Sequence, residues 1–281
     1  MSNRYKFIDE KGEHLHTLDD KPLLGTTTIL GVISKPLTWW AAGKACEQLG
    51  WLKSLKTDKK ATREEKSNRE AERFDRANQA LSLIRVMGTG EYQQLLDKAY
   101  RAHHEYKEKR AGEGSNLHDL AEEWIKHKMS DAPPMSTTEI SGFTNLFPFM
   151  EWCNKNVKSF LFSEIHCYSE KLWVGGKTDF AYEDMDGNYV LADIKSRDQD
   201  YFSDHIQCGF YDTLLRENGG LDKDGNVIWN TTDSKWFTKH AIFTLGPNFK
   251  EPVFSKSTAA NREGALSALS LYKLKQEFEG D

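Results

Sequence analysis

The chain has 281 residues, of which 38% are hydrophobic and 12% aromatic, and this composition excludes an intrinsically disordered chain. Its 43 acidic and 38 basic residues give a formal net charge of −5, which argues against a surface coated in cations but leaves room for a local basic groove. No segment approaches the roughly 18 consecutive apolar residues of a membrane span, and residues 1–16 contain no apolar signal region. We therefore expect an intracellular protein without a membrane partner.

The N-terminal segment, residues 1–36, is predicted to be β-rich. Its short alternating runs are separated by a turn at residues 10–12 and by another near Pro22 and Gly25. The run TTTIL at residues 26–30 fits either a strand or the start of a helix.

A helical region is predicted over residues 37–156, because apolar residues recur there at helical spacing. Residues 91–128 predict one helix, a break at residues 112–114, and a second helix capped by Ser115 or Asn116. A loop at residues 131–134 precedes a helix at residues 144–156, whose inward side chains would be Phe147, Phe149, Met150 and Trp152.

A charged segment, residues 53–76, interrupts this region with side chains of both signs and few apolar residues. One interpretation is a solvated helix held by salt bridges, or a mobile arm. The other is a flap that follows a phosphate backbone. On the second interpretation the DNA-binding cations would be Lys59, Lys60, Arg63, Lys66 and Arg69.

The C-terminal part, residues 157–281, changes to a two-residue period. Three strands are predicted between residues 160 and 196, with the sequence DMDGN at 184–188 as the turn between the last two. A helix at residues 203–216, a further strand and a final helix follow. The whole order predicts a mixed α/β fold with a helical N-terminal half, in one compact structural domain.

Two carboxylates and a lysine are the candidate active-site groups within residues 157–281. Asp193 and Lys195 are two residues apart on a predicted strand, so both project from the same face. If DMDGN is a five-residue hairpin loop, Asp179 lies directly opposite Asp193. Carboxylates at that distance repel each other, and a divalent cation is their natural counter-charge; their hard oxygens suit Mg²⁺ or Mn²⁺.

A lysine beside such carboxylates can act on a phosphate. It can orient or deprotonate an attacking water, or stabilise the charge on a pentacovalent phosphate. The alternative is a cross-strand salt bridge on an exposed sheet face. Leu191 shares a face with Asp193 and Lys195, which makes a solvated surface a weaker explanation.

The motifs GGKTD ending at Asp179, DIK at Asp193–Lys195 and Gln207-x-x-x-Tyr211 resemble, in that order, the RecB-like branch of the PD-(D/E)XK nuclease superfamily. The sequence GSNLH, ending at His118, matches the upstream histidine of that branch. Residues 25–45 are similar to the starts of phage exonucleases related to the mitochondrial genome-maintenance exonuclease. The resemblance covers roughly residues 20–275, and the block 179–211 is its specific part.

The resemblance implies a nuclease core over residues 157–281, with a central mixed sheet flanked by helices, and a metal-dependent DNA exonuclease of phage-like recombination, replication or repair. An endonuclease with the same site, and a catalytically decayed DNA-binding or assembly protein, are the alternatives. The implied partner is DNA, as a single strand or a duplex end, together with a single-strand annealing or replication protein. The implied location is the cytoplasm of a bacterial or phage-infected cell.

The resemblance also assigns roles to residues. Lys195 would be catalytic, and Gln207 and Tyr211, at i and i+4 on one helix face, would orient the lysine or the nucleic-acid backbone, unless they are ordinary packing residues. His118 would otherwise be a capping or core histidine. The implied ligands of Mg²⁺ or Mn²⁺ are His118, Asp179, Asp193 and the Ile194 carbonyl, with Glu164 as a further candidate.

The four cysteines do not suggest a metal site. Cys46, Cys153, Cys167 and Cys208 lie far apart without a CxxC pair, whereas zinc and iron–sulfur sites have closer ligand spacing. Relatives with an iron–sulfur cluster have cysteines where this chain has none. We expect buried free thiols and no iron–sulfur cluster.

Overall fold

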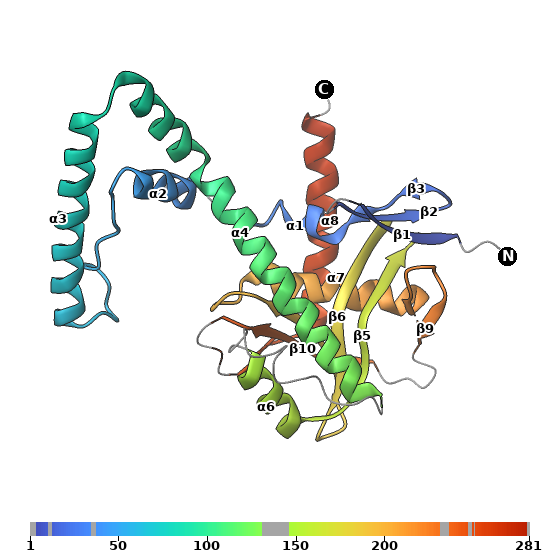
Figure 1. Ribbon diagram of the computed structural model, residues 1–281. Coiled ribbons are helices and arrows are strands. Elements are labelled where there is room, and N and C mark those ends of the chain that lie inside the picture. The colour runs from blue at the N-terminus through green and yellow to red at the C-terminus, as the bar shows by residue number, and fades with distance from the viewer. Residues whose placement is uncertain are drawn as a thin grey trace. The chain divides into compact units, whose positions relative to one another are not determined.

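The computed structural model describes residues 4–10, 13–34, 38–130, 146–230, 236–246, 249 and 251–279 (Figure 1). The chain forms two compact units, one of residues 1–34 with 114–281 and one of residues 35–113. This grouping differs from the single compact domain expected, because residues 35–113 make their contacts mainly among themselves. Each unit is described by itself below.

The larger unit is built on a mixed sheet of eight strands. Its order is β11-β10-β7-β6-β5-β8-β9, with β4 paired to β6. β7 is parallel to β10 and antiparallel to β6. The strands are β4 (Leu24–Gly25), β5 (Val157–Ser169), β6 (Val174–Asp184), β7 (Tyr189–Lys195), β8 (Gly220–Leu221), β9 (Val227–Trp229), β10 (Phe237–Thr244) and β11 (Val253–Phe254).

A second, three-stranded sheet belongs to the same unit. It has the order β1-β2-β3 and contains β1 (Tyr5–Glu10), β2 (Glu13–Leu18) and β3 (Lys21–Pro22). The β-rich N-terminal segment is therefore confirmed. The ambiguous run Thr26–Leu30 is a helix, α1.

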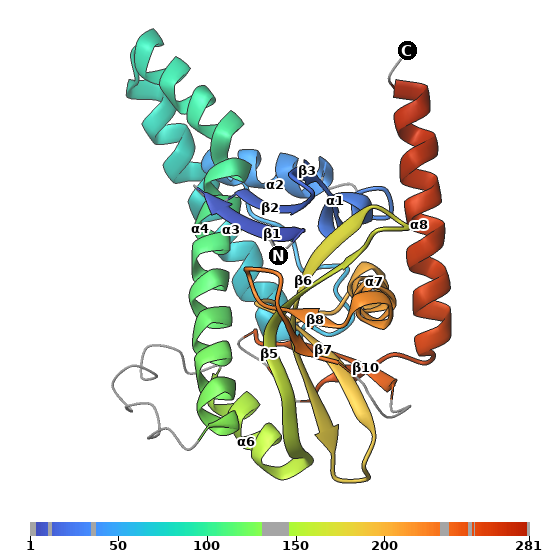
Figure 2. The ribbon, with the colours of Figure 1, turned by 90° about the vertical axis from the view of Figure 1, so that its right-hand side faces the viewer.

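Helices cover both faces of the large sheet, as Figure 2 shows for α4 and α7. The elements on one face are α1, α7 (Phe202–Asn218) and α8 (Thr258–Glu279), whose apolar side chains share a core with Leu191 of β7. On the other face, the end of α4 (Thr89–Met129) and α6 (Leu146–Asn156) share a core with Val190 and Ala192. The expected mixed α/β class, with a central mixed sheet flanked by helices, is confirmed.

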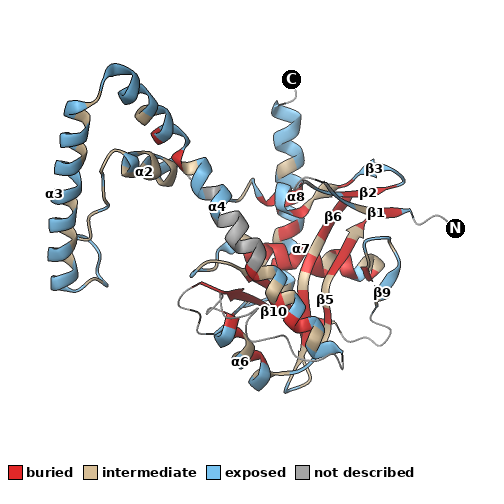
Figure 3. Ribbon diagram, in the orientation of Figure 1, coloured by how far each residue is buried: buried red, intermediate tan, exposed pale blue. Residues whose placement is uncertain are grey.

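Because both faces of the sheet are covered, β7 is buried almost throughout, as Figure 3 shows for the central strands. The β6–β7 turn is the expected one. Gly187 has φ of +82°, and Asp184 Oδ1 accepts the N–H groups of Asp186 and Asn188.

The helix break expected at residues 112–114 is wrong, because α4 continues from Thr89 to Met129. A glycine inside a helix costs only about 1 kcal/mol relative to alanine, whereas a new helix would need another costly nucleus. Ser115 and Asn116 therefore do not begin a helix.

Two further details of the helical region differ from the prediction. Phe147 is exposed on α6, whereas Phe149 is fully buried, because residues two apart lie on different sides of a helix. Cys46 is exposed, while the other three free cysteines are buried. The loop predicted at residues 131–134 and the helix start at residues 144–145 lie outside the described residues.

The smaller unit contains α2 (Thr38–Gln48), α3 (Arg63–Val86) and the first part of α4. α3 begins with a capping box, in which Thr62 Oγ1 accepts the N–H of Glu65 and the Glu65 carboxylate accepts the N–H of Thr62. Arg73 Nε donates to the Leu52 carbonyl at 2.7 Å, and this bond holds the preceding segment along α3.

Candidate active site

The β6–β7 register brings the two predicted carboxylates opposite each other. The ladder pairs Ala181 with Leu191 and ends with the pair of Phe180 and Ala192. The same register continued by one residue places Asp179 opposite Asp193. Beyond the ladder, Asp179 Oδ2 accepts the backbone N–H of Ile194 at 2.6 Å. The Asp179 carboxylate therefore makes the hydrogen bond to the Ile194 N–H that a backbone carbonyl of the neighbouring strand would otherwise make.

Asp193 lies in the interior of the unit and not on an exposed sheet face. Its exposed fraction is 1%. Leu191, on the same face of β7, packs in the core beneath α7, whereas Ile194 packs in the core on the other face. The alternative of a solvated cross-strand salt bridge therefore does not describe this position.

Lys195 is held from two sides. Its Nζ lies 2.7 Å from Asp193 Oδ2 and donates to Gln207 Oε1 at 3.0 Å. Gln207 Nε2 in turn contacts the hydroxyl oxygen of Tyr211 at 2.6 Å. The i and i+4 pair of α7 thus faces the lysine as predicted, with Tyr211 reaching it only through Gln207.

Gly176 explains how Tyr211 can lie so close to the strand. A Cβ at this position would be 2.8 Å from Tyr211 Cε1 and 3.0 Å from Thr26 Cγ2. Any larger residue would push α7 or α1 away from β6, so the second glycine of the GGKTD motif serves this close approach.

Burial and the neighbouring charges together set the ionisation of Asp193 and Lys195. Burial, with the nearby charge of Asp179, raises the pKa of Asp193 to about 7, although the Lys195 ammonium opposes this. The pKa of Lys195 is raised in spite of its burial, because the charges of Asp193 and Asp179 favour the ammonium form. The lysine is therefore a cation in this arrangement.

His118 approaches from α4. Its Nδ1 lies 3.9 Å from Asp179 Oδ2, and its side chain is 31% exposed. This distance is too long for a hydrogen bond. The predicted histidine is thus beside one of the two carboxylates, that of Asp179.

Glu164 extends the row of carboxylates to a third strand. The β5–β6 register pairs Ser163 with Phe180 and Ile165 with Thr178, which places Glu164 opposite Asp179. Glu164 has φ of +47°, and its Oε1 accepts from Lys177 Nζ at 2.5 Å. Its side chain is therefore already engaged by a cation.

Glu122 is a residue that the sequence interpretation missed. Its side chain is hydrogen-bonded to the Glu164 carboxylate. Burial, together with that carboxylate, raises the pKa of Glu122 to about 7. Burial alone would raise the pKa of Glu164, but the bonds from Glu122 and Lys177 outweigh it and lower that pKa. The available signal was position, because Glu122 follows His118 by four residues on the same helix face.

Asp179 and Asp193 fit a hard divalent cation. Both offer carboxylate oxygens, the ligands that Mg²⁺ and Mn²⁺ prefer. Asp193 Oδ2 is buried and, apart from its ion pair with Lys195, accepts no hydrogen bond from the described residues. Among the residues with defined positions, no three His, Cys, Asp or Glu side chains converge on one point. The Ile194 carbonyl, His118 and Glu164 therefore remain predicted ligands.

The candidate DNA-binding cations all belong to the unit of residues 35–113. Here the salt-bridged helix is confirmed for part of the segment, with the pairs Arg69–Glu72, Arg73–Glu70 and Arg76–Glu72. By contrast, Lys59, Lys60, Arg63 and Lys66 form no ion pair within the described part of the chain. These four are the cations left for a phosphate backbone.

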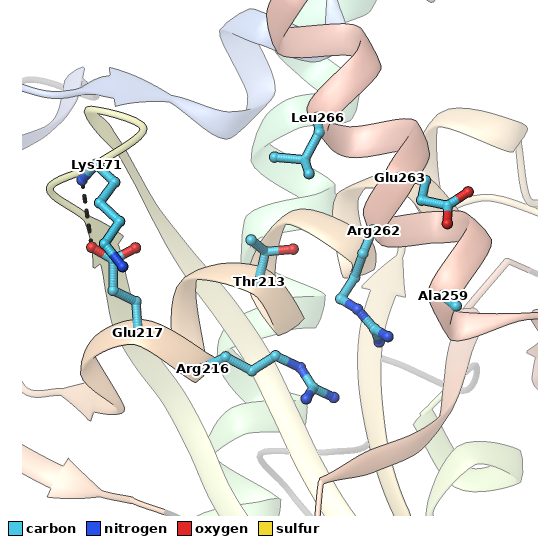
Figure 4. A pocket seen from close by; sticks show the side chains of 8 residues that line it. All are labelled: Lys171, Thr213, Arg216, Glu217, Ala259, Arg262, Glu263 and Leu266. Atoms are coloured by element: carbon cyan, nitrogen blue, oxygen red, sulfur yellow. Dashed lines mark hydrogen bonds between the residues drawn. The ribbon is translucent and has the colours of Figure 1, made fainter.

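A separate pocket of about 470 Å³ lies between α7 and α8 (Figure 4). Arg216 and Arg262, which line it, both donate to the buried carboxylate of Asp212. A Cβ at Gly209 would lie 2.2 Å from the Asn261 carbonyl oxygen, so the two helices touch closely here. The arginines therefore join α7 to α8, and we assign the pocket no part in the active site.

A scan against protein-family models gives no match for this chain, and a search of the curated proteins gives none. Within the described ranges, no helix has both the length and the apolar character required to cross a membrane.

Proposed function

We propose that the chain is a Mg²⁺- or Mn²⁺-dependent deoxyribonuclease that degrades DNA from an end, as part of recombination, replication or repair in a bacterial or phage-infected cytoplasm. The observation that carries the proposal is the β6–β7 register, which places Asp179 opposite Asp193, beside a lysine fixed by Gln207. Two carboxylates with one buried cation fit phosphodiester hydrolysis better than they fit packing.

In the proposed reaction, water attacks phosphorus, the bond to the leaving oxygen breaks, and that oxygen gains a proton. Asp179 and Asp193 would hold the metal ion, which when bound neutralises charge that develops on the phosphate. Lys195 carries its proton in this arrangement. It would therefore donate a hydrogen bond to a phosphate oxygen or orient the water, and Gln207 would fix its direction.

Degradation of DNA with and without free ends tests the proposal. Linear and closed circular substrates are incubated with Mg²⁺, with Mn²⁺ or with EDTA, beside the Lys195→Ala variant. Loss of linear DNA alone, dependent on metal and on Lys195, is the expected result. Cleavage of the circle identifies an endonuclease with the same site. DNA binding without cleavage of any substrate indicates a decayed nuclease site, which would overturn the proposal.

A further inference from the structure

The segment that follows β7 presents two neighbouring aromatic rings to solvent. β7 ends at Lys195, and Tyr201 and Phe202 stand at the start of α7. The exposed fractions of these two residues are 43% and 69%. Single exposed apolar residues are common, but two adjacent rings next to a candidate active site form a surface that a ligand can cover.

Asp204 connects these rings to the candidate active site. Its carboxylate accepts the backbone N–H of Tyr201 at 2.7 Å and pairs with Arg197 Nη2. The helix that begins here, α7, also carries Gln207, whose Oε1 accepts from Lys195 Nζ at 3.0 Å. The rings therefore lie next to the predicted catalytic groups.

Arg197 holds the segment in a fixed shape. Its N–H donates to the Lys195 carbonyl at 2.8 Å, and its Nε donates to the Gln199 carbonyl at 2.8 Å. The guanidinium carbon lies 4.6 Å from the centre of the Tyr201 ring, so one face of that ring is covered by a cation. The cation and the rings are thus preorganised as one surface.

We propose that Tyr201 and Phe202 form a stacking platform for the bases of a single DNA strand entering the candidate active site. This inference rests on the proposed nuclease function and names the form of its substrate. Aromatic rings beside an arginine are the combination that binds single strands without sequence preference, because every base has a π face. Bases of a duplex are already stacked on their neighbours. The platform therefore discriminates against uninterrupted duplex.

Binding in EDTA tests the platform without cleavage. The probes are fluorescein-labelled oligothymidylate, a blunt duplex of equal length and an oligouridylate, and the variants are Tyr201→Leu and Phe202→Leu in the full chain. Leucine keeps apolar bulk and removes the ring. Stacking typically changes affinity by about 5- to 150-fold per base. We expect a loss of at least fivefold for oligothymidylate in each variant and an unchanged affinity for the duplex.

The matched control is Phe278→Leu, which changes a ring that is 79% exposed near the end of α8 and should leave binding unchanged. An oligothymidylate with one abasic position, moved along the strand, should weaken binding to the unaltered protein at one or two positions and have no effect there in the variants. Equal affinity of Phe202→Leu and the unaltered protein for oligothymidylate overturns the platform, as does tighter binding of oligouridylate. Absence of cleavage with the stacking effect intact would refute the nuclease proposal alone.

Discussion

Asp179 Oδ2 accepts the backbone N–H of Ile194, the residue between Asp193 and Lys195, at 2.6 Å. One carboxylate of the candidate metal site is therefore fixed by the main chain of the strand that carries the other. This arrangement lets the charge of Asp193 be removed without releasing Asp179.

Asp193→Asn is expected to lower Mn²⁺ affinity while the fold is kept. The amide has the same shape, and the change removes a carboxylate whose burial is unfavourable. Titration calorimetry with Mn²⁺ measures the affinity, and Asp186→Asn, at an exposed position in the turn of the same hairpin, is the control. Unchanged Mn²⁺ binding by Asp193→Asn and by Asp179→Ala would contradict the assignment of these ligands.

Lys195→Ala is expected to reduce cleavage by about 10²- to 10⁴-fold, the range for a group engaged in the transition state. Metal and DNA binding should be largely kept, because the lysine acts on the water or the phosphate. The control is Lys239→Ala, which removes a lysine paired with Asp184 at 2.6 Å elsewhere in the sheet. Turnover by Lys195→Ala at the unaltered rate would exclude a catalytic lysine.

Gln207→Leu is expected to lower kcat by about tenfold with little change in KM, because the lysine remains but loses the acceptor that directs it. Tyr211→Phe should have a smaller effect, since Tyr211 reaches the lysine only through Gln207. Single-turnover rates at saturating DNA measure both. If both variants lose thermal stability but keep the rate of the folded protein, the pair has a packing role only.

Local rules were enough to predict the position of Asp179 relative to Asp193. Side chains alternate along a strand, and the DMDGN turn fixes the hairpin register, so the pairing follows from the sequence. The Gln207–Tyr211 face follows from helical spacing in the same way. These contacts depend on residues near one another in the chain or joined by one turn.

Contacts that depend on tertiary approach could not be predicted in this way. Glu122 meets Glu164 only because α4 lies against β5, and no local pattern determines that distance. The left-handed backbone of Glu164 is equally hidden in the sequence. The break predicted in α4 is wrong because glycine weakens a helix without necessarily ending it.

We expect the free energy of unfolding to fall in mild acid, because the structure contains two buried histidines. Burial lowers the pKa of His16 to about 3 and that of His166 to about 4. The unfolded chain, with histidine pKa near 6.5, binds these protons first. The stabilisation is therefore complete above pH 6.5 and declines as the pH falls towards 4.

Each of these histidines should lower the free energy of unfolding by about 2 kcal/mol between pH 6.5 and 5. Urea unfolding at several pH values measures this, and His166→Phe, which keeps a ring against Phe7, should show a shallower pH dependence. An equal slope in the variant would mean that His166 titrates normally in the folded protein.

The last prediction concerns the cations of the charged segment that have no ion-pair partner among the described residues. A polyanion must be bound by a chain whose net charge is −5, so cations for its phosphates have to be concentrated locally, and we propose that this segment contacts a single strand. Each phosphate contact to a single strand contributes about −0.7 to the slope of log affinity against log salt. The triple change of Lys59, Lys60 and Arg63 to Ala should therefore flatten that slope by roughly two units and reduce processivity, while the cleavage step itself is little affected.

Arg76→Ala is the control, because this arginine is already paired with Glu72 at 3.2 Å. Anisotropy titrations of labelled oligothymidylate across a salt series measure the slope, and an unchanged slope in the triple variant would leave the segment as a solvated helix.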